Sequence, residues 1–426
     1  MRPGPRRWLI VHCSILLAAY AGASAQRVPE RLTIEQAVAE ALRNNLSLLA
    51  QHTNIGIAQA RVLAARLRPN PVLSVEADHL DWLGTGFNDL NAGGPTEINF
   101  HTDFTWERGG KRRLRTEVAE AARSVAEFEF MNAARGTVLE VQTAFVDALL
   151  ARDSLALARE NLKFLERIVE INAARVRAGD LAEVELARSR LAALQFENAV
   201  RQAELRQRIA LTRLETLLGR TPPTGRIEVT GELRREPLPP DLEGLRGLAR
   251  QLRPDLLALQ RDLRRAEADL RSQLAQAKPD YTLGTEYRRQ QVNAKSNSLG
   301  FTLSVPLPVF NRNQGEIERA RQEQRQTQLR LRALELAIAA DIDNAFQQAL
   351  TALGLLDNIE EKMLAQARSV RETTEYSYQR GEASLLELLD AQRAFNETMQ
   401  AYLDARAEYA RALYTIDAAS GKAVQP

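Results

Sequence analysis

The feature that most restricts how this 426-residue chain can fold is an internal duplication. Short motifs of the first half return in the second half, in the same order and at nearly constant spacing. The matched positions are Asn45-Leu46 with Asp255-Leu256, Pro69 with Pro279, Leu73 with Leu283, Glu76 with Glu286, Arg108 with Arg312, Gly179 with Gly381, Glu185-Leu186 with Glu387-Leu388, and Gly219 with Gly421. The period is far longer than the units of about 20–50 residues that build solenoids. We therefore expect two copies of one structural plan.

Composition marks the boundary between the two copies. The segment 220–241 is predicted to be a linker because it is rich in proline, at Pro222, Pro223, Pro237, Pro239 and Pro240. The linker separates a first structural repeat, 26–219, from a second one, 242–421. Residues 422–426 are expected to form a C-terminal tail.

The beginning of the chain has the pattern of a secretory leader. Three arginines precede a mostly apolar run from Trp8 to Ala21, and Ala23-Ser24-Ala25 offers small residues for cleavage. We expect a signal peptide at 1–25 and a mature chain that starts at Gln26. The only cysteine, Cys13, lies in this leader. The exported chain should therefore lack disulfides, thiolate metal ligands and a cysteine-linked lipid anchor.

Charge and hydropathy exclude two classes of protein. The chain has 57 Lys and Arg against 55 Asp and Glu, whereas nucleic-acid-binding proteins show a basic excess. No nucleic-acid partner is expected. After the leader, no apolar run reaches the length of about 18 residues that a transmembrane helix needs.

Stretches without proline predict very long helices in both repeats. The expected helices cover Thr33–Arg68, Lys111–Ala178, Leu242–Lys278 and Gln314–Arg380, and further helices run from Gly179 to Gly219 and from Gly381 to Gly421. Heptad spacing indicates that they pack as coiled coils. In the helix from Gly381 to Gly421, the heptad positions that form the packing seam include the polar residues Gln392 and Arg406. Polar residues at such positions can belong to an interface that opens to water, or they can simply fix the alignment of the packed helices. Both interpretations fit equally well.

Two short segments before each long helix have the alternating pattern of strands. In 73–78, 98–107, 281–288 and 299–305, apolar and polar side chains alternate, which predicts a sheet with one apolar and one wet face. These lengths suit tilted membrane strands of about 9–11 residues, although a small soluble sheet packed on the helices would show the same alternation. Four strands cannot close a membrane barrel, and lipid tolerates no open sheet edge. Strands that span a membrane would thus require several copies of the chain.

The wet face of this sheet carries the candidate residues of a pore. They are Glu76, Asp78, His101, Asp103 and Glu286. His101 and Asp103 lie two positions apart on the same face, but a conduit should not bind its cargo tightly. We predict solvated lumen residues and no metal site.

These segments resemble the TolC-type outer membrane efflux factor family over nearly all of Gln26–Gly421. The supporting motifs are Leu32-Thr33-Ile34-Glu35-Gln36-Ala37, Tyr378-Gln379-Arg380-Gly381, and Ser384-Leu385-Leu386-Glu387-Leu388-Leu389-Asp390-Ala391-Gln392. Trp106-Glu107-Arg108-Gly109-Gly110-Lys111-Arg112-Arg113 and Pro306-Leu307-Pro308-Val309-Phe310-Asn311-Arg312-Asn313-Gln314-Gly315 resemble the heavy-metal subgroup of the cobalt–zinc–cadmium resistance type.

The resemblance implies a mainly α-helical fold with a small β part. Duplicated long helices would form an α-helical barrel, a coiled-coil tunnel, and four strands per chain would contribute to a trimeric, twelve-stranded transmembrane β-barrel. The protein would lie in the outer membrane of a Gram-negative bacterium and extend into the periplasm. It would not be an enzyme and would need no cofactor. Many metal-efflux members are lipoproteins, but this sequence has no cysteine at the leader junction, so we expect no Cys-linked lipid anchor here.

The implied function is passive conduction within a tripartite efflux system. A homotrimer would export substrate, heavy-metal cations in this subgroup, from an inner-membrane, proton-driven resistance-nodulation-division pump through a periplasmic adaptor. Two alternatives remain at this point. The same fold could export organic drugs or type I secreted proteins, or the chain could be a periplasmic coiled-coil scaffold without channel activity.

The resemblance also assigns residues to a periplasmic gate and a docking surface. Glu387 and Asp390 match positions that form carboxylate rings, which attract cations. Gly179 and Gly381 would meet the adaptor, where a missing side chain permits close approach.

A link between Tyr378 and Glu185 would hold the second repeat against the first. Ala383 occupies the position at which some relatives place an arginine of this latch. Arg380 is the candidate that would replace it.

Overall fold

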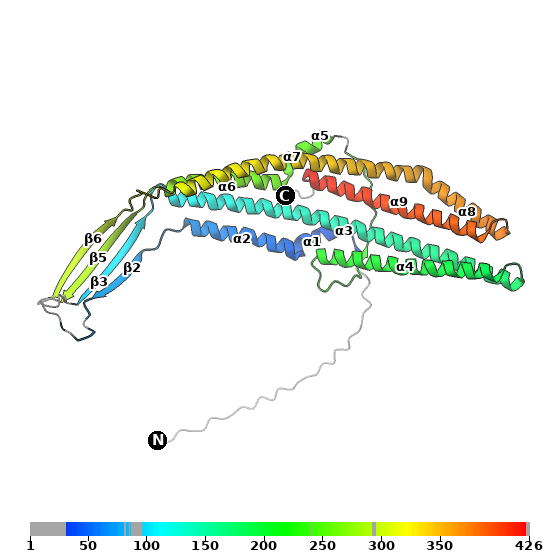
Figure 1. Cartoon of the computed structure of the whole chain (residues 1–426), viewed down its shortest axis with the longest axis horizontal. Helices are drawn as coiled ribbons and strands as arrows, with labels where there is room; N and C mark the ends of the chain where they lie inside the picture. Colours follow the sequence, from blue (N-terminus) through cyan, green and yellow to red (C-terminus); the bar gives the residue numbers. More distant parts are fainter. Residues whose placement is uncertain are drawn as a thin grey trace, which may run out of the picture.

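The computed structural model describes residues 31–80, 82–84, 86, 96–239, 241–291 and 295–422. The expected signal peptide, 1–25, lies outside the described residues, as do residues 423–426 of the expected tail. Long helices run side by side along the molecule, with a sheet at one end and two helix–helix turns at the other (Figure 1).

The two halves of the chain contain the same elements in the same order. The first half forms β1 (Arg31–Leu32), α1 (Ile34–Asn44), α2 (Leu46–Arg66), β2 (Val72–Asp78), β3 (Glu97–Trp106), α3 (Lys111–Ala178) and α4 (Glu183–Leu217). The second forms β4 (Glu228–Val229), α5 (Leu242–Leu252), α6 (Pro254–Gln276), β5 (Tyr281–Gln291), β6 (Lys295–Ser304), α7 (Gln314–Asn358), the π-helical turn η1 (Ile359–Met363), α8 (Leu364–Arg380) and α9 (Leu385–Ser420). The short strands β1 and β4 pair in parallel.

The prediction of one helix over Thr33–Arg68 is wrong, because the chain leaves helical geometry at Asn45. The Asn45 side chain accepts a hydrogen bond from the Leu48 N–H at 3.0 Å and so caps α2. Its amide also donates to the Leu217 carbonyl at 2.8 Å. The second repeat breaks in the same way at Arg253, where Pro254 can occupy only the first turn of a new helix.

The predicted helix from Lys111 to Ala178 forms without a break and has 68 residues. Its counterpart, predicted from Gln314 to Arg380, is interrupted by η1. There the Leu364 N–H bonds to the Ile359 carbonyl, five residues back. A π turn accommodates one extra residue within a helix, and proline or glycine is not needed to cause it. The proline-free pattern therefore could not reveal it.

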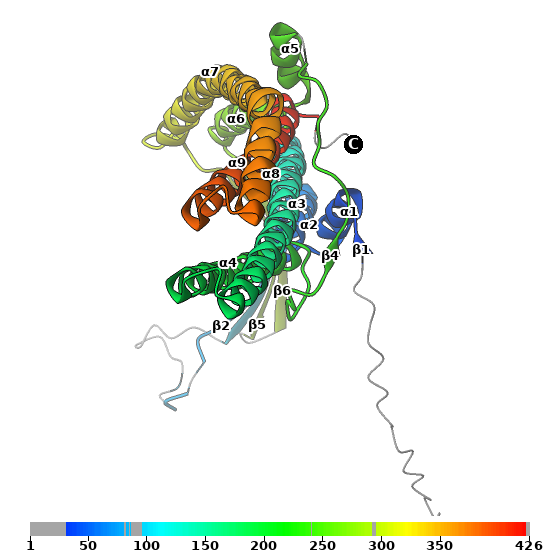
Figure 2. The same ribbon diagram turned by 90° about the vertical axis from the view of Figure 1, so that its right-hand side faces the viewer.

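The hydrophobic core lies where the two repeats meet at mid-length. The helix α3 packs against α1, α2, α4, α6 and α9, and Figure 2 shows it near the centre of the bundle. Buried apolar side chains of α3, including Val141, Phe145 and Leu149, form one cluster with Leu214 of α4 and Ala407 of α9.

The four longer strands form one antiparallel sheet in the order β2-β3-β5-β6. The pairing of β3 with β5 joins the two repeats, with Phe100 opposite Tyr287. The predicted alternation holds, and the apolar face carries exposed side chains: Leu73, Val75, Ile98, Phe100, Phe104, Leu283, Tyr287, Leu299, Phe301 and Leu303. Within the described part of the chain, no helix combines the length and apolarity needed to cross a membrane.

Candidate gate at the helical tips

Glycines end the two helices that reach the far end of the molecule. Gly179 follows α3 and Gly381 follows α8, both in the left-handed region, with φ of 84° and 79°. Glycine adopts this conformation without steric cost. A Cβ built on either glycine would meet no atom within 4 Å. Both tips thus have open space around them.

Tyr378 joins α8 to α3 just below these tips. Its side chain is only 3% exposed, and its hydroxyl donates a hydrogen bond to Asn172 Oδ1 at 2.6 Å. Within this chain the hydroxyl hydrogen is thus used by Asn172 and not by Glu185, and the latch between Tyr378 and Glu185 stays a prediction. Glu185 lies beyond the turn, on α4, and pairs with Arg188 at 2.9 Å. Burial raises the pKa of Tyr378, which keeps the hydroxyl protonated as a donor.

Arg175, which is not among the residues predicted for the gate, completes this contact. Its guanidinium donates to the carbonyl oxygens of Tyr378, at 3.3 Å, and Gln379 at the end of α8. Arg380, predicted to form the latch, instead lies over the ring of Tyr376 at 4.4 Å. Arg175 stands three residues after Asn172, on the same helix face. That spacing was the available signal.

The two predicted ring carboxylates are not equivalent. Glu387 belongs to a capping box, in which it accepts hydrogen bonds from the Ser384 N–H at 2.7 Å and hydroxyl at 2.9 Å. The backbone hydrogen bond from Ser384 and then its hydroxyl lower the pKa of Glu387. Asp390 is 61% exposed and has only a loose contact with Arg393, at 3.8 Å. Asp390 therefore carries the freer charge.

Buried amides line the contact between α3 and α9 nearer the middle of the molecule. Gln392, one of the polar seam residues, is 1% exposed and donates to Asn161 Oδ1 at 2.9 Å. Asn161 in turn donates to Asn396 Oδ1. In this structure Gln392 thus contacts a helix rather than water. The other polar seam residue, Arg406, lies over Tyr402 at 5.5 Å.

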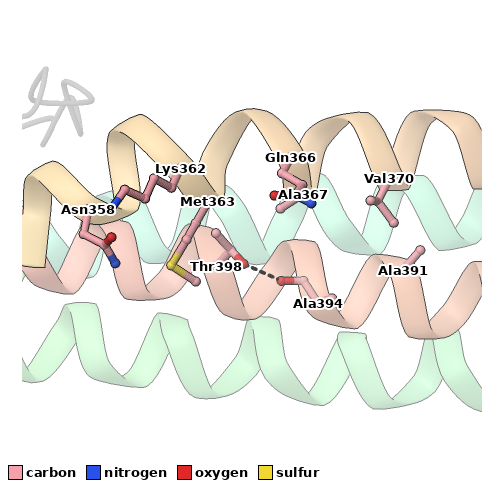
Figure 3. A pocket seen from close by; sticks show the side chains of 9 residues that line it. All are labelled: Asn358, Lys362, Met363, Gln366, Ala367, Val370, Ala391, Ala394 and Thr398. Carbon is pink, nitrogen blue, oxygen red and sulfur yellow. Dashed lines mark hydrogen bonds between the residues drawn. The ribbon is translucent and has the colours of Figure 1, made fainter.

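A hollow of about 430 Å³ lies beside this seam, between the π turn with α8 and the facing side of α9. Figure 3 shows Met363 of η1 reaching toward α9, next to Thr398. The hollow is lined by Asn358, Lys362, Met363, Gln366, Ala367, Val370, Ala391, Ala394 and Thr398. No carboxylate, histidine or cysteine belongs to this lining.

The predicted lumen residues share the polar face of the sheet. His101 stands opposite Glu286, and its Nε2 lies 2.9 Å from Asp103 Oδ1. Glu286 accepts a hydrogen bond from Arg288 at 2.9 Å. Glu76 and Asp78 line the edge strand β2 on the same face. No group of three or more potential metal ligands occurs among the residues that the structure describes.

Three comparisons place this architecture among known proteins. The model of the outer membrane efflux protein family matches residues 37–220 and 245–422. The "Cobalt-zinc-cadmium resistance protein CzcC" of Cupriavidus metallidurans is 24% identical over 392 residues, which cover 92% of this chain and 90% of that protein. The "Cation efflux system protein CusC" of Escherichia coli K12 is 26% identical over 402 residues, or 87% and 82% of the two chains.

A solved structure agrees with these sequence matches. The CmeC outer membrane channel of Campylobacter jejuni superposes with a TM-score of 0.77 at 15% identity, covering 92% of this chain and 86% of that one. At this identity the superposition establishes the fold.

Proposed function

The chain belongs to the outer membrane efflux protein family, and from this premise we propose that it is the outer membrane channel of a tripartite efflux system. Three copies would close one conduit, which passes heavy-metal cations outward without catalysis. As a member of this family, the protein is an efflux component and not an enzyme.

The open edges of the sheet carry the proposal of a trimer. β2 and β6 are the two edge strands, and neither has a second neighbour among the described strands. The exposed apolar face suits lipid, but unpaired edge N–H and C=O groups cannot remain in lipid. If β6 of one copy pairs with β2 of the next, every strand gains two neighbours. Three copies supply twelve strands, within the range of known membrane barrels.

The charge of the polar face supports a cation as cargo. In the described strands, this face carries one arginine, Arg288, and no lysine. It carries five carboxylates, those of Glu76, Asp78, Glu97, Asp103 and Glu286. A pore lined by carboxylates concentrates cations and repels anions. The printed names of CzcC and CusC, which refer to cobalt, zinc, cadmium and cations, point in the same direction.

An adaptor would dock at the tips that Gly179 and Gly381 form, and the pump would act through that adaptor. Gly381→Asn tests the docking, because asparagine tolerates a positive φ and its Cβ would meet open space. Folding should persist while cross-linking to the adaptor weakens. Unchanged cross-linking by a well-folded variant would refute the docking role.

Edge-to-edge closure is tested by cysteine cross-linking in a Cys13→Ser background, which is otherwise free of thiols. Val75→Cys on β2 and Phe301→Cys on β6 should give covalent dimers and trimers with a bifunctional maleimide. The control pair, Phe100→Cys with Tyr287→Cys, faces within one chain and should give an intrachain product. If the Val75–Phe301 pair gave only monomers while the control pair cross-linked within the chain, the trimer would be contradicted.

The cargo is tested separately in a deletion strain. Sensitivity to cobalt, zinc, cadmium, copper and silver salts should rise and be restored by the wild-type gene. Sensitivity confined to organic toxicants would overturn the metal assignment but leave the channel in place. Mass spectrometry of the purified protein tests the expected processing. The measured mass should equal that of the chain from Gln26 onward, without an added lipid.

A further inference from the structure

A basic cluster lies where the sheet joins the helices. Arg68, which follows α2, and Arg112 and Arg113, in the first turn of α3, line a hollow of about 290 Å³ together with Trp106 at the end of β3. A neighbouring hollow of about 570 Å³ shares Arg112 and Arg113. We call Arg68, Arg112 and Arg113 the junction cluster.

The junction cluster holds positive charge that the chain itself does not neutralise. Within the described residues, the guanidinium groups of Arg68 and Arg112 take part in no hydrogen bond or ion pair. Arg113 has a loose contact with Glu117, at 3.8 Å. By contrast, the neighbouring Lys111 is buried and pairs with Asp280 at 2.8 Å. The carboxylates that line the two hollows also pair with other arginines: Glu107 with Arg115, Glu117 with Arg271, and Glu120 with Arg66. The junction cluster therefore keeps an excess of positive charge.

The duplication shows that this excess is not needed to build the fold. The corresponding helix of the second repeat, α7, starts with Gln314, Gly315 and Glu316 and has an acidic residue in its first turn. The first turn of α3 has none. Basic groups at a helix N-terminus oppose the helix dipole. Arg112 and Arg113 therefore stand where the fold by itself disfavours positive charge, and an external anion would relieve that cost.

The surroundings of the cluster point to a lipid as the source of that anion. Trp106 is 66% exposed and lies on the apolar face, in line with Phe104 and Phe100. On the strand-to-helix connection of the second repeat, Phe310 is 91% exposed. An exposed apolar band that ends in aromatic side chains is typical of a membrane–water boundary. Unpaired arginines just beyond such a band lie at the level of lipid headgroups.

We infer that the junction cluster binds the phosphate of an anionic phospholipid, of the phosphatidylglycerol type, in the leaflet next to the helices. The apolar chains of that lipid would lie along the sheet beside Trp106. Arginine suits the role because its planar donors match phosphate oxygens in pairs. The inference rests on the proposed membrane placement of the sheet, and it adds a ligand that the channel function alone does not require.

Lipid binding can be measured by native mass spectrometry of the full-length protein in a neutral detergent. Phosphatidylglycerol and phosphatidylcholine with the same acyl chains are titrated separately. Wild type should retain phosphatidylglycerol preferentially. The triple variant Arg68→Gln, Arg112→Gln, Arg113→Gln should bind it at least about tenfold more weakly, because each basic contact at a lipid surface contributes separately.

The matched control removes three exposed arginines from the helical surface: Arg206→Gln, Arg325→Gln and Arg332→Gln. It should bind phosphatidylglycerol like wild type. Arg112→Gln alone, at an exposed side chain without a partner, provides a conservative second variant with a smaller loss. Equal binding of both lipids by wild type, an equal loss in the control, or displacement of the lipid by millimolar inorganic phosphate would each overturn the inference.

Conductance in planar bilayers separates this inference from the proposed function. Wild type that forms channels without preferring phosphatidylglycerol would refute the lipid site alone. Wild type that forms neither trimers nor channels would refute the function on which the site rests.

Discussion

Tyr378 is the side chain through which the tip of α8 is held on α3. Its hydroxyl is satisfied by Asn172, whose side chain is 0% exposed. Arg175 holds the carbonyls at the end of the same helix. A buried, fully directional contact of this kind favours one arrangement of the tip, and it must break before the tip can move away from α3.

Tyr378→Phe should loosen this arrangement. The substitution leaves Asn172 Oδ1 buried without its donor, which costs about 1–3 kcal/mol of stability. We expect a lower unfolding midpoint in denaturant and a larger channel conductance in planar bilayers. The control is Tyr376→Phe, two residues away, where the ring is exposed and lies over Arg380. Equal effects of both substitutions would contradict a specific role for Tyr378.

Asp390 and Glu387 should differ in their influence on ion flow. Asp390→Asn removes an exposed charge and should reduce cation selectivity, measured as the reversal potential in a salt gradient. Glu387→Gln should have a smaller effect on selectivity, because the Glu387 carboxylate is engaged with Ser384. A larger effect of Glu387→Gln, or no effect of either variant, would argue against Asp390 as the main gate charge.

Among the elements, η1 is the feature that distinguishes the second repeat from the first. The helix bends where α7 passes through η1 into α8 (Figure 1). The matching helix α3 continues without a break through its 68 residues. A π turn departs from the regular hydrogen-bond ladder of an α-helix, and the hollow of about 430 Å³ lies against Lys362 and Met363 of η1. We therefore expect η1 to act as a hinge between α7 and the tip.

Deleting Lys362 should convert η1 into regular α-helix. The extra residue is then absent, so α8 keeps its phase and Tyr378 should still reach Asn172. We expect amide exchange at 359–364 to slow by roughly tenfold, which corresponds to about 1.4 kcal/mol of local stability. Lys362→Ala keeps the residue count and should retain fast exchange. Loss of the Tyr378 contact upon deletion would show that η1 sets the phase of α8 instead.

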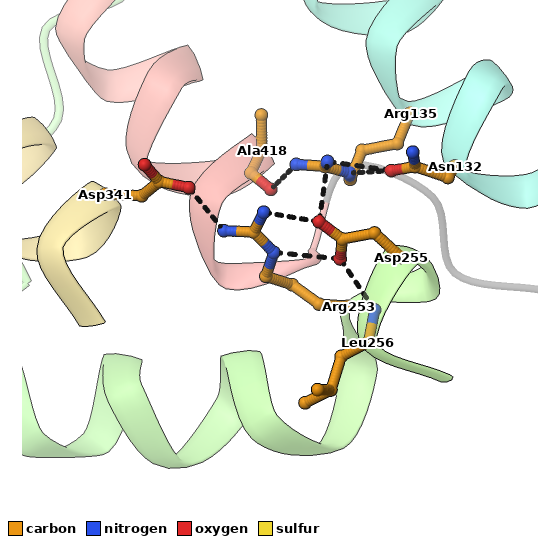
Figure 4. Close-up of polar contacts among 7 residues, drawn as sticks. All are labelled: Asn132, Arg135, Arg253, Asp255, Leu256, Asp341 and Ala418. Atoms are coloured by element: carbon orange, nitrogen blue, oxygen red, sulfur yellow. Dashed lines mark hydrogen bonds and ion pairs between the residues drawn. The ribbon is translucent and has the colours of Figure 1, made fainter. Parts of the chain in front are cut away.

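Across the whole molecule, a charge network ties the two repeats together at mid-length (Figure 4). Arg253 donates to Asp255 at 3.0 Å and to Asp341 at 2.9 Å. Arg135 of α3 lies 3.7 Å from Asp255 and donates to the Ala418 carbonyl of α9 at 2.8 Å. One carboxylate therefore serves two guanidinium groups that come from different repeats.

Asp255→Asn should destabilise the assembly of the two repeats. The change leaves Arg135 and Arg253 close together with only Asp341 to compensate, and breaking such a pair costs about 3 kcal/mol. Thermal unfolding should report the loss, whereas the more exposed surface pair of Arg246 with Asp343 provides the control variant, Asp343→Asn. Equal midpoints for the two variants would show that the network contributes no more than a surface ion pair.

Acid should weaken the same network. Burial alone would raise the pKa of Asp255, but the hydrogen bond and charge of Arg253 hold it below its ordinary value near 3.8. The stabilisation is therefore complete above that value and is lost as the pH falls through the lower folded pKa. Wild type should lose stability there more steeply than Asp255→Asn, which has no carboxylate to titrate.

Features that depend on neighbouring residues in the sequence could be predicted from it. The duplicated order of elements, the faces of the strands and the glycines that end α3 and α8 all follow from local periodicity and backbone conformation. Pairing across the chain could not be predicted. Tyr378 and Asn172 lie in different repeats, and nothing local distinguishes Asn172 from Glu185 as the partner.

The amino-acid sequence by itself determined a duplicated chain with long helices and four strands that each have one apolar and one polar face. These features follow from the spacing of apolar side chains along the sequence, which repeats about every 3.6 residues in helices and about every 2 residues in strands. The tertiary structure alone decided the helix break at Asn45, the π turn at 359–363, and the partner of Tyr378. It also decided which arginines remain unpaired. These outcomes depend on packing between distant segments, where each charge and hydrogen-bond donor has several possible partners and geometry selects one.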